Sequence, residues 1–139
     1  MKNLRVDAKV ESLDEVMAFV EGELEAAGAS MKATMAITLS VEEVFVNIAH
    51  YAYKDSMAAE GYAEISMELS ESPKAVTITF TDEGKPYNPL EREDPDITLS
   101  AEERGIGGLG IFLVKKNMDE VSYEYRDGKN ILTAKKSLN

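Results

Sequence analysis

The segment VEEVFVNIAHYAY combines an apolar helical pattern with polar side chains that could do chemistry. Glu43, Asn47 and His50 follow one another at spacings of four and three, which places them on one face of a helix. The rest of the segment is apolar on most of its circumference, as in a buried helix, so this polar face needs a partner. A carboxylate and an amide one turn apart suit Mg²⁺, and the carboxylate could serve as a general base. A face turned to solvent would show the same spacing.

A second candidate is the sequence Thr81-Asp82-Glu83-Gly84, where a predicted strand ends in an aspartate. A carboxylate in this position could accept a hydrogen bond from the exocyclic amine of adenine. Gly84 would allow the backbone to approach the base closely, because glycine has no Cβ. The pattern D-x-G is also common in turns that bind nothing, so this motif is weak when taken alone.

A third candidate is the glycine cluster GIGGLG, which directly precedes a predicted helix. Free backbone N–H groups and the positive end of a helix favour phosphate binding. The cluster lacks the Lys-Ser/Thr of a Walker loop, and it does not follow the strand of a Rossmann unit. A flexible hinge remains the alternative. The glycines concerned are Gly105, Gly107, Gly108 and Gly110.

The elements that position these motifs follow from hydrophobic periodicity and turn signals. A capping box at Ser12 and Glu15 predicts the start of a first helix, and Gly28 predicts its end. Ser30 is expected to cap a second helix that runs to about Tyr53. The predicted strands are 4–8, 62–69, 76–82, 121–125 and 130–136, with a helix over about 109–118 and a long aperiodic loop before it. Asp127-Gly128 predicts a tight hairpin turn.

This element order predicts an α+β fold with one domain spanning residues 1–139. We expect a two-layer sandwich, in which a mixed, mostly antiparallel sheet carries helices on one face.

Composition narrows the classes of function. The chain has 15 basic and 26 acidic residues, and its formal charge of −11 disfavours binding to nucleic acid or to a membrane surface. An ATP site in such a protein would depend on a divalent metal and backbone dipoles. The absence of cysteine excludes disulfides and thiolate metal sites. Neither a signal peptide nor an apolar run of about 20 residues is present, so we expect a cytoplasmic protein.

Taken in order, the three motifs resemble those of the GHKL superfamily of ATPases and kinases. VEEVFVNIAHYAY looks like the N box of that superfamily, and TDEGKPYNP looks like its G1 box. ERGIGGLGIFLVKKNMDEVSYEYRDGKNILTAKK looks like the G2 box with its closing hairpin. The form of the boxes is most similar to the anti-sigma factor serine/threonine kinases. The resemblance spans about residues 4–137 and implies the Bergerat fold, or histidine kinase-like ATPase fold, with ATP and Mg²⁺ as ligands.

The resemblance also implies a role for each matching residue. Asn47 would hold Mg²⁺, and Glu43 would be the general base or water-orienting group. Asp82 would bind the adenine amino group, with Gly84 close to the base. The four glycines would wrap the phosphates.

Two further residues complete the implied site. Arg104 would approach the terminal phosphate, although it could instead pair with a neighbouring glutamate at the surface. Thr133 would reach the adenine-binding aspartate through its hydroxyl, although it could equally be a packing residue. His50 lies within the N box itself, and we interpret it as structural.

The implied reaction transfers the γ-phosphoryl group of ATP to a serine or threonine of a STAS-type anti-sigma antagonist. The implied partners also include a sigma factor or other regulator and a second copy of the chain. The acidic, proline-interrupted segment LEREDPDITLSAEERG departs from the best-known family members. A non-catalytic module that uses ATP to gate protein binding is therefore the alternative, and Glu43 favours the kinase because a pure binder has no need of a carboxylate there.

Overall fold

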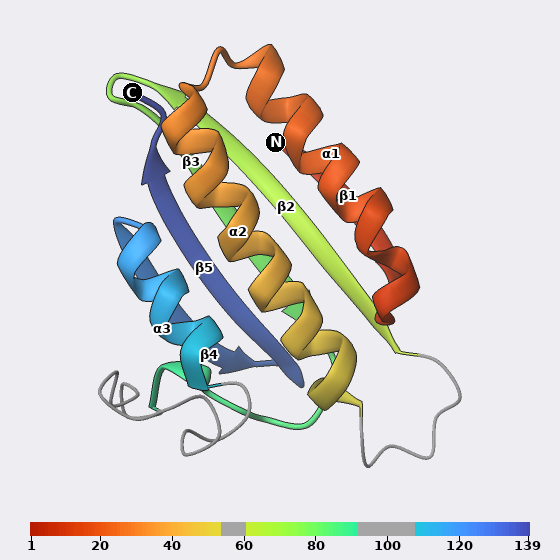
Figure 1. Cartoon of the computed structure of the whole chain (residues 1–139). Coiled ribbons are helices and arrows are strands. Elements are labelled where there is room, and N and C mark those ends of the chain that lie inside the picture. The colour runs from red at the N-terminus through yellow and green to blue at the C-terminus, as the bar shows by residue number, and fades with distance from the viewer. Residues whose placement is uncertain (54–60, 92–107) are drawn as a thin grey trace.

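The computed structural model describes residues 1–53, 61–91 and 108–139. These residues form two layers, a five-stranded sheet and three α-helices that lie on one of its faces (Figure 1). The strands are β1 (Lys2–Asp7), β2 (Tyr62–Glu71), β3 (Lys74–Asp82), β4 (Glu120–Arg126) and β5 (Lys129–Ser137), in the order β1-β2-β3-β5-β4. The predicted α+β sandwich is confirmed, and every pair in this part of the sheet is antiparallel.

The helices are α1 (Leu13–Ala26), α2 (Met31–Asn47) and α3 (Gly108–Asn117). Short helical turns lie at Val10–Ser12, Ile48–Ala52 and Pro89–Glu91. In Figure 1, α2 runs along the middle of the helical layer, between α1 and α3. The core lies between the layers, because alternate residues of each strand face the helices. In β3, for example, Val76, Ile78 and Phe80 are buried while the intervening threonines are partly exposed.

The helix ends follow local sequence signals with one exception. Ser30 caps α2 as predicted, since its side chain accepts a hydrogen bond from the Ala33 N–H at 3.1 Å. Gly28 follows the end of α1 with a φ of +72°, which glycine adopts without strain. The predicted capping box at Ser12 is wrong, because Ser12 ends the short 3₁₀ turn Val10–Ser12 and has helical backbone angles. Its side chain makes no capping bond.

The second helix changes its winding at the end that approaches the sheet. It was expected to continue to about Tyr53, but α2 ends at Asn47 and passes into the π-helical turn Ile48–Ala52. The i→i+5 hydrogen bonds of a π-helix reduce the rotation about the helix axis per residue. Residues four apart therefore lie more nearly above one another than in an α-helix. Tyr51 therefore follows Asn47 on the side facing the sheet, and His50 is left exposed.

The β4–β5 hairpin and the end of β3 position the residues at one edge of the cavity. Asp127 and Gly128 have φ angles of 56° and 78°, which gives the predicted two-residue turn between β4 and β5. β3 ends at Asp82, also as predicted. The pairing of β3 with β5 then places Asp82 opposite Asn130.

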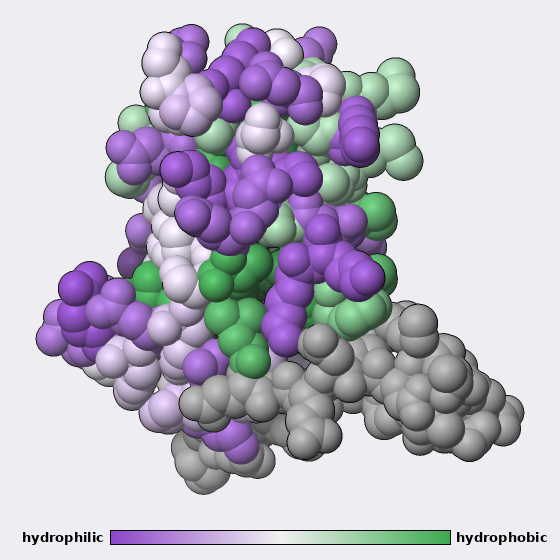
Figure 2. Space-filling view, turned by 90° about the vertical axis from the view of Figure 1, so that its left-hand side faces the viewer, coloured by the Kyte–Doolittle hydropathy of each residue, from purple (hydrophilic) through white to green (hydrophobic). Residues whose placement is uncertain are grey.

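The described surface includes charged regions and an apolar stripe on α2. The side of the molecule that carries α3 is mostly hydrophilic, with a smaller group of hydrophobic side chains near its centre (Figure 2). Along α2, Met31, Met35 and Leu39 are one turn apart and 80%, 59% and 52% exposed. Exposed apolar stripes of this kind are typical of contact with another protein. None of the described helices is long and apolar enough to cross a membrane.

Candidate functional site

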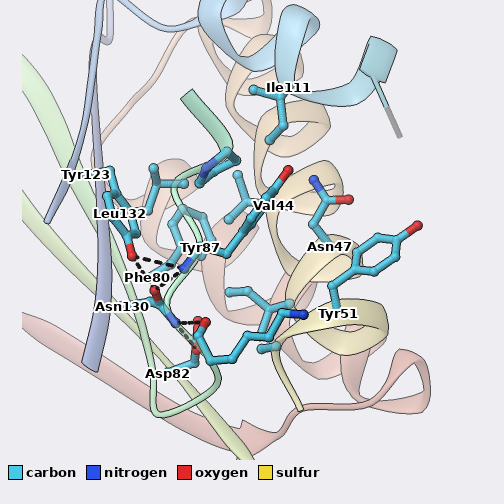
Figure 3. Close-up of a pocket in the computed structure, with 14 residues that line it drawn as sticks. Val44, Asn47, Tyr51, Phe80, Asp82, Tyr87, Ile111, Tyr123, Asn130 and Leu132 are labelled. Atoms are coloured by element: carbon cyan, nitrogen blue, oxygen red, sulfur yellow. Dashed lines mark hydrogen bonds between the residues drawn. The ribbon is translucent and has the colours of Figure 1, made fainter. Parts of the chain in front are cut away.

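A cavity of about 340 Å³ lies between the C-terminal half of α2 and the ends of β3 and β5 (Figure 3). Its wall is largely apolar, with a few polar groups from separate elements, as is typical of a small-molecule site. The lining residues are Val44, Asn47, Ile48, Tyr51, Ala52, Phe80, Asp82, Lys85, Tyr87, Pro89, Ile111, Tyr123, Asn130 and Leu132.

Asp82 is the buried carboxylate of this cavity, with only 5% of its surface exposed. Its Oδ1 accepts hydrogen bonds from the Gly84 N–H at 2.9 Å and from Asn130 Nδ2 at 3.0 Å. Its Oδ2 accepts no hydrogen bond from the described residues. Oδ2 is also not among the fully buried polar atoms without a partner, since the described residues contain no such atom. Because Asp82 lines the cavity, Oδ2 is the oxygen that could accept a hydrogen bond from a ligand.

Burial raises the pKa of the Asp82 carboxyl, because a charged group loses hydration when it is enclosed. The hydrogen bonds from Asn130 and Gly84 act in the opposite direction and lower the pKa. These two donors thus favour the ionised carboxylate, which only accepts hydrogen bonds.

Gly84 lies where two backbones come into contact. A Cβ at this position would lie 2.2 Å from the carbonyl oxygen of Ala52, at the end of the π-helical turn. The next residue, Lys85, donates its N–H to that same oxygen at 2.9 Å. The turn after β3 is therefore bonded to the end of the second helix, and only glycine fits there.

We expect Gly84→Ala to destabilise the protein by about 1–3 kcal/mol, because the new Cβ must push backbone away from backbone. Gly22→Ala is the matched control, since a Cβ at Gly22 in α1 would meet nothing within 4 Å. Alanine in that helix interior is expected to add up to about 1 kcal/mol of stability. Chemical denaturation of both variants measures the difference. Equal stability of Gly84→Ala and the parent would contradict the close contact.

Asn130 is a site residue that the sequence interpretation missed. It is 8% exposed at the start of β5 and joins Asp82 to the loop after β3 and to Tyr123 of β4. The signal was present in the pattern, because Asn130 has the same strand parity as the inward-facing Leu132 and Ala134. Tyr51, Tyr87 and Tyr123 were also missed, and each lines the cavity.

Thr133 does not make the expected contact with Asp82. It pairs with Thr79 in the sheet, and its neighbours Leu132 and Ala134 are the buried residues of β5. Because side chains alternate along a strand, Thr133 belongs to the opposite face of the sheet, away from the cavity. Asn130 takes the position opposite Asp82 instead.

The α2 side of the cavity carries the other two polar candidates. Asn47 lines the cavity, and Figure 3 shows it on the helix across from Asp82. Glu43 lies one turn before Asn47 and is half-buried, but it is not among the lining residues. Gly108 and Gly110 lie in the first turn of α3, whose Ile111 reaches the cavity. Arg104, Gly105 and Gly107 fall outside the described residues.

The polar side chains of the cavity offer few ligands to a metal ion. No group of three or more acidic, histidine or cysteine side chains within the described ranges could hold a metal on its own. A Mg²⁺ ion commonly keeps waters and takes phosphate oxygens with one or two protein ligands. A single amide oxygen, that of Asn47, beside the cavity of Asp82 and Gly84 therefore fits an ion that arrives with a nucleotide.

Comparisons with known proteins agree with this geometry. Residues 6–136 match the family described as the histidine kinase-like ATPase domain. The serine/threonine-protein kinase BtrW of Bordetella bronchiseptica is 29% identical over 104 residues, covering 75% of this chain and 70% of the relative. The serine-protein kinase RsbW of Listeria monocytogenes is 27% identical over 136 residues, covering 95% and 84%.

A solved structure has the same fold. It contains the RsbU and RsbW domains of Rv1364c from Mycobacterium tuberculosis, and the TM-score is 0.65 at 15% sequence identity. The match covers 99% of this chain but only 33% of that longer one. With the family match extending over nearly all of the sequence, the chain belongs to the histidine kinase-like ATPase domain family and is similar to the protein kinases RsbW and BtrW.

Proposed function

We propose that this protein binds Mg·ATP in the cavity and is a serine/threonine protein kinase of the anti-sigma factor type. Its substrate would be a serine or threonine of a STAS-type anti-sigma antagonist, and it would also bind a sigma factor or other regulator in the cytoplasm. The observation that carries the proposal is the buried Asp82 carboxylate, which lines a largely apolar cavity. The names of the two kinase relatives support the reaction.

Adenine recognition is assigned to the sheet side of the cavity. Asp82 Oδ2 would accept a hydrogen bond from the exocyclic amine, and Gly84 would let the backbone lie close to the ring. Apolar side chains of both layers, including Ile48, Phe80 and Leu132, would enclose the flat base. An apolar slot with one acceptor at its end suits adenine, because most of the ring surface is apolar.

The phosphates are assigned to the helix side. Asn47 is the residue proposed to hold Mg²⁺, which would offset the charge of the phosphates in this acidic protein. The backbone N–H groups at the start of α3, at Gly108 and Gly110, favour anionic oxygens. Gly105 and Gly107 are proposed to extend this cradle, and Arg104 to stabilise charge on the transferred group.

The transfer step would use Glu43. Its carboxylate would accept the proton of the substrate hydroxyl as that oxygen bonds to the γ-phosphorus. The bond between this phosphorus and the β–γ bridging oxygen would break, and ADP would leave with that oxygen. Glu43 lies one helical turn from Asn47, so both side chains can serve the same phosphate region.

The exposed stripe of Met31, Met35 and Leu39 is the surface at which a partner protein would bind. A module that binds partners under the control of ATP, without transfer, would use the same stripe and cavity. The two functions therefore differ only in whether phosphate reaches a partner, which is the quantity to measure.

Mg·ATP and Mg·ADP are expected to bind and to raise the melting temperature, because a ligand that binds only the folded state stabilises it. Calorimetry and thermal melts with each nucleotide test this. Transfer of labelled γ-phosphate to a serine or threonine of STAS-like proteins from the same genome tests the kinase. A folded protein that binds no adenine nucleotide would refute the assignment. ATP-dependent partner binding without any transfer would favour the gated module.

A further inference from the structure

Asn130 forms hydrogen bonds to several parts of the cavity wall. Its Nδ2 lies 3.0 Å from Asp82 Oδ1, 3.0 Å from the carbonyl oxygen of Lys85 and 3.3 Å from that of Gly84. Its Oδ1 accepts hydrogen bonds from the N–H of Tyr87, at 3.1 Å, and from the Tyr123 hydroxyl (dashed in Figure 3). Both amide hydrogens and both oxygen lone pairs are therefore in use.

The orientation of this amide is fixed by partners that can only donate or can only accept a hydrogen bond. The carbonyl oxygens of Gly84 and Lys85 can only accept, so the atom facing them must be nitrogen. The Tyr87 N–H can only donate, so the atom facing it must be oxygen. The side chain therefore cannot flip, and it always presents an N–H group to Asp82.

This arrangement determines what Asp82 offers to a ligand. Oδ1 already accepts two hydrogen bonds, from Asn130 and Gly84, so Oδ2 is the oxygen left for the base. Both bonds also favour the ionised carboxylate against the effect of burial. An ionised carboxylate attracts the amine of adenine and repels the carbonyl oxygen that guanine carries at the same ring position. A protonated carboxyl could donate to that carbonyl oxygen.

We propose that Asn130 is a positioning residue for base specificity, which keeps Asp82 an acceptor and thereby selects adenine over guanine nucleotides. The inference rests on the proposed nucleotide site. Through Tyr87 and Tyr123, the same side chain ties this acceptor to the loop after β3 and to β4. The orientation of Asn130, which lies on β5, is thus fixed by the loop after β3 and by β4.

Asn130→Asp is the sharpest test, since it preserves shape but replaces the Nδ2 donor with an oxygen 3.0 Å from Asp82. Two carboxyls at that distance raise each other's pKa. Asp82 is then protonated more readily, and its protonated carboxyl can present an O–H donor to guanine. We expect the preference for ATP over GTP, measured as the ratio of dissociation constants in calorimetry, to fall by roughly 10-fold or more. Tyr123→Phe removes one support of Asn130 without touching Asp82, and it should lower the ratio by a smaller factor.

Thr133→Ala is the matched control, because Thr133 is on the same strand but on the opposite face, and its ratio should stay at the parental value. If Asn130→Asp weakens ATP and GTP binding by the same factor, Asn130 is only structural and the inference is wrong. If that variant fails to fold, an unchanged ratio in folded Tyr123→Phe overturns the inference. A parent protein that binds no ATP would refute the proposed function itself, whereas parental binding with unaltered variant ratios refutes only the role of Asn130.

Discussion

Asp82→Asn is expected to weaken binding of adenine nucleotides by roughly 10- to 100-fold, while the fold remains intact. The side-chain oxygen of asparagine can keep the hydrogen bonds from Gly84 and Asn130 that Oδ1 accepts now. The amide nitrogen then replaces Oδ2 and presents a donor to the donor amine of adenine. The loss therefore falls on recognition of the base rather than on packing.

The stability of this variant should equal or exceed that of the parent at neutral pH. Burial raises the pKa of Asp82 in the folded state, so the folded protein binds this proton more tightly than the unfolded chain does. The free energy of unfolding therefore falls as pH rises from the unfolded-state pKa through the raised folded-state pKa. Above that window the full penalty of the buried charge is present, and asparagine removes it.

Calorimetric titration and thermal melts between acidic and neutral pH measure both effects. Asp127→Asn is the matched control, because it makes the same chemical change at an exposed turn residue whose φ of 56° asparagine tolerates. That variant should bind ATP as the parent does. Parental affinity in Asp82→Asn would show that the adenine contact lies elsewhere.

Glu43→Gln is expected to slow phosphoryl transfer by roughly 100-fold or more, with ATP affinity nearly unchanged. Glutamine preserves the shape of the side chain but cannot take the proton of the attacking hydroxyl. Affinity should persist because Glu43 is absent from the wall of the cavity that Asp82 and Asn47 line. Single-turnover transfer to a phosphorylatable partner and calorimetry of ATP binding separate the two quantities.

The neighbouring Glu42→Gln provides the control for this experiment. Glu42 is exposed on α2, whereas Glu43 is half-buried, so the same loss of charge there should leave transfer at the parental rate. Equal transfer by Glu43→Gln and the parent would make Glu43 structural and the base mechanism wrong. A selective loss in Glu43→Gln, with binding retained, would favour the kinase over the gated module.

The sequence by itself determined the features that depend on local chemistry. Alternation in β3 placed its end at Asp82, because residues two apart share a face of a strand. Asp127-Gly128 determined the β4–β5 turn, since both residues tolerate the positive φ that the turn requires. Ser30 determined the start of α2 through its own side-chain oxygen. Each of these signals acts within a few residues of its effect.

Local signals failed where a competing local structure or the sheet register decided the outcome. Ser12 has the residue type of a cap, but the 3₁₀ turn that precedes α1 already gives it helical angles. Thr133 lies on the correct strand, but the register of β5 on β3 turns it to the face away from the cavity. A shift of one residue in that register would exchange the two faces.

Only the tertiary structure decided how the site is held together. Asn130 and Asp82 are 48 residues apart, and they meet because β5 pairs with β3 in one register. Gly84 needs to be glycine because its turn packs on Ala52, at the end of a π-helical turn that hydrophobic periodicity does not reveal. Such contacts arise from the packing of distant segments, where the position of each backbone is set by the whole core rather than by its own sequence.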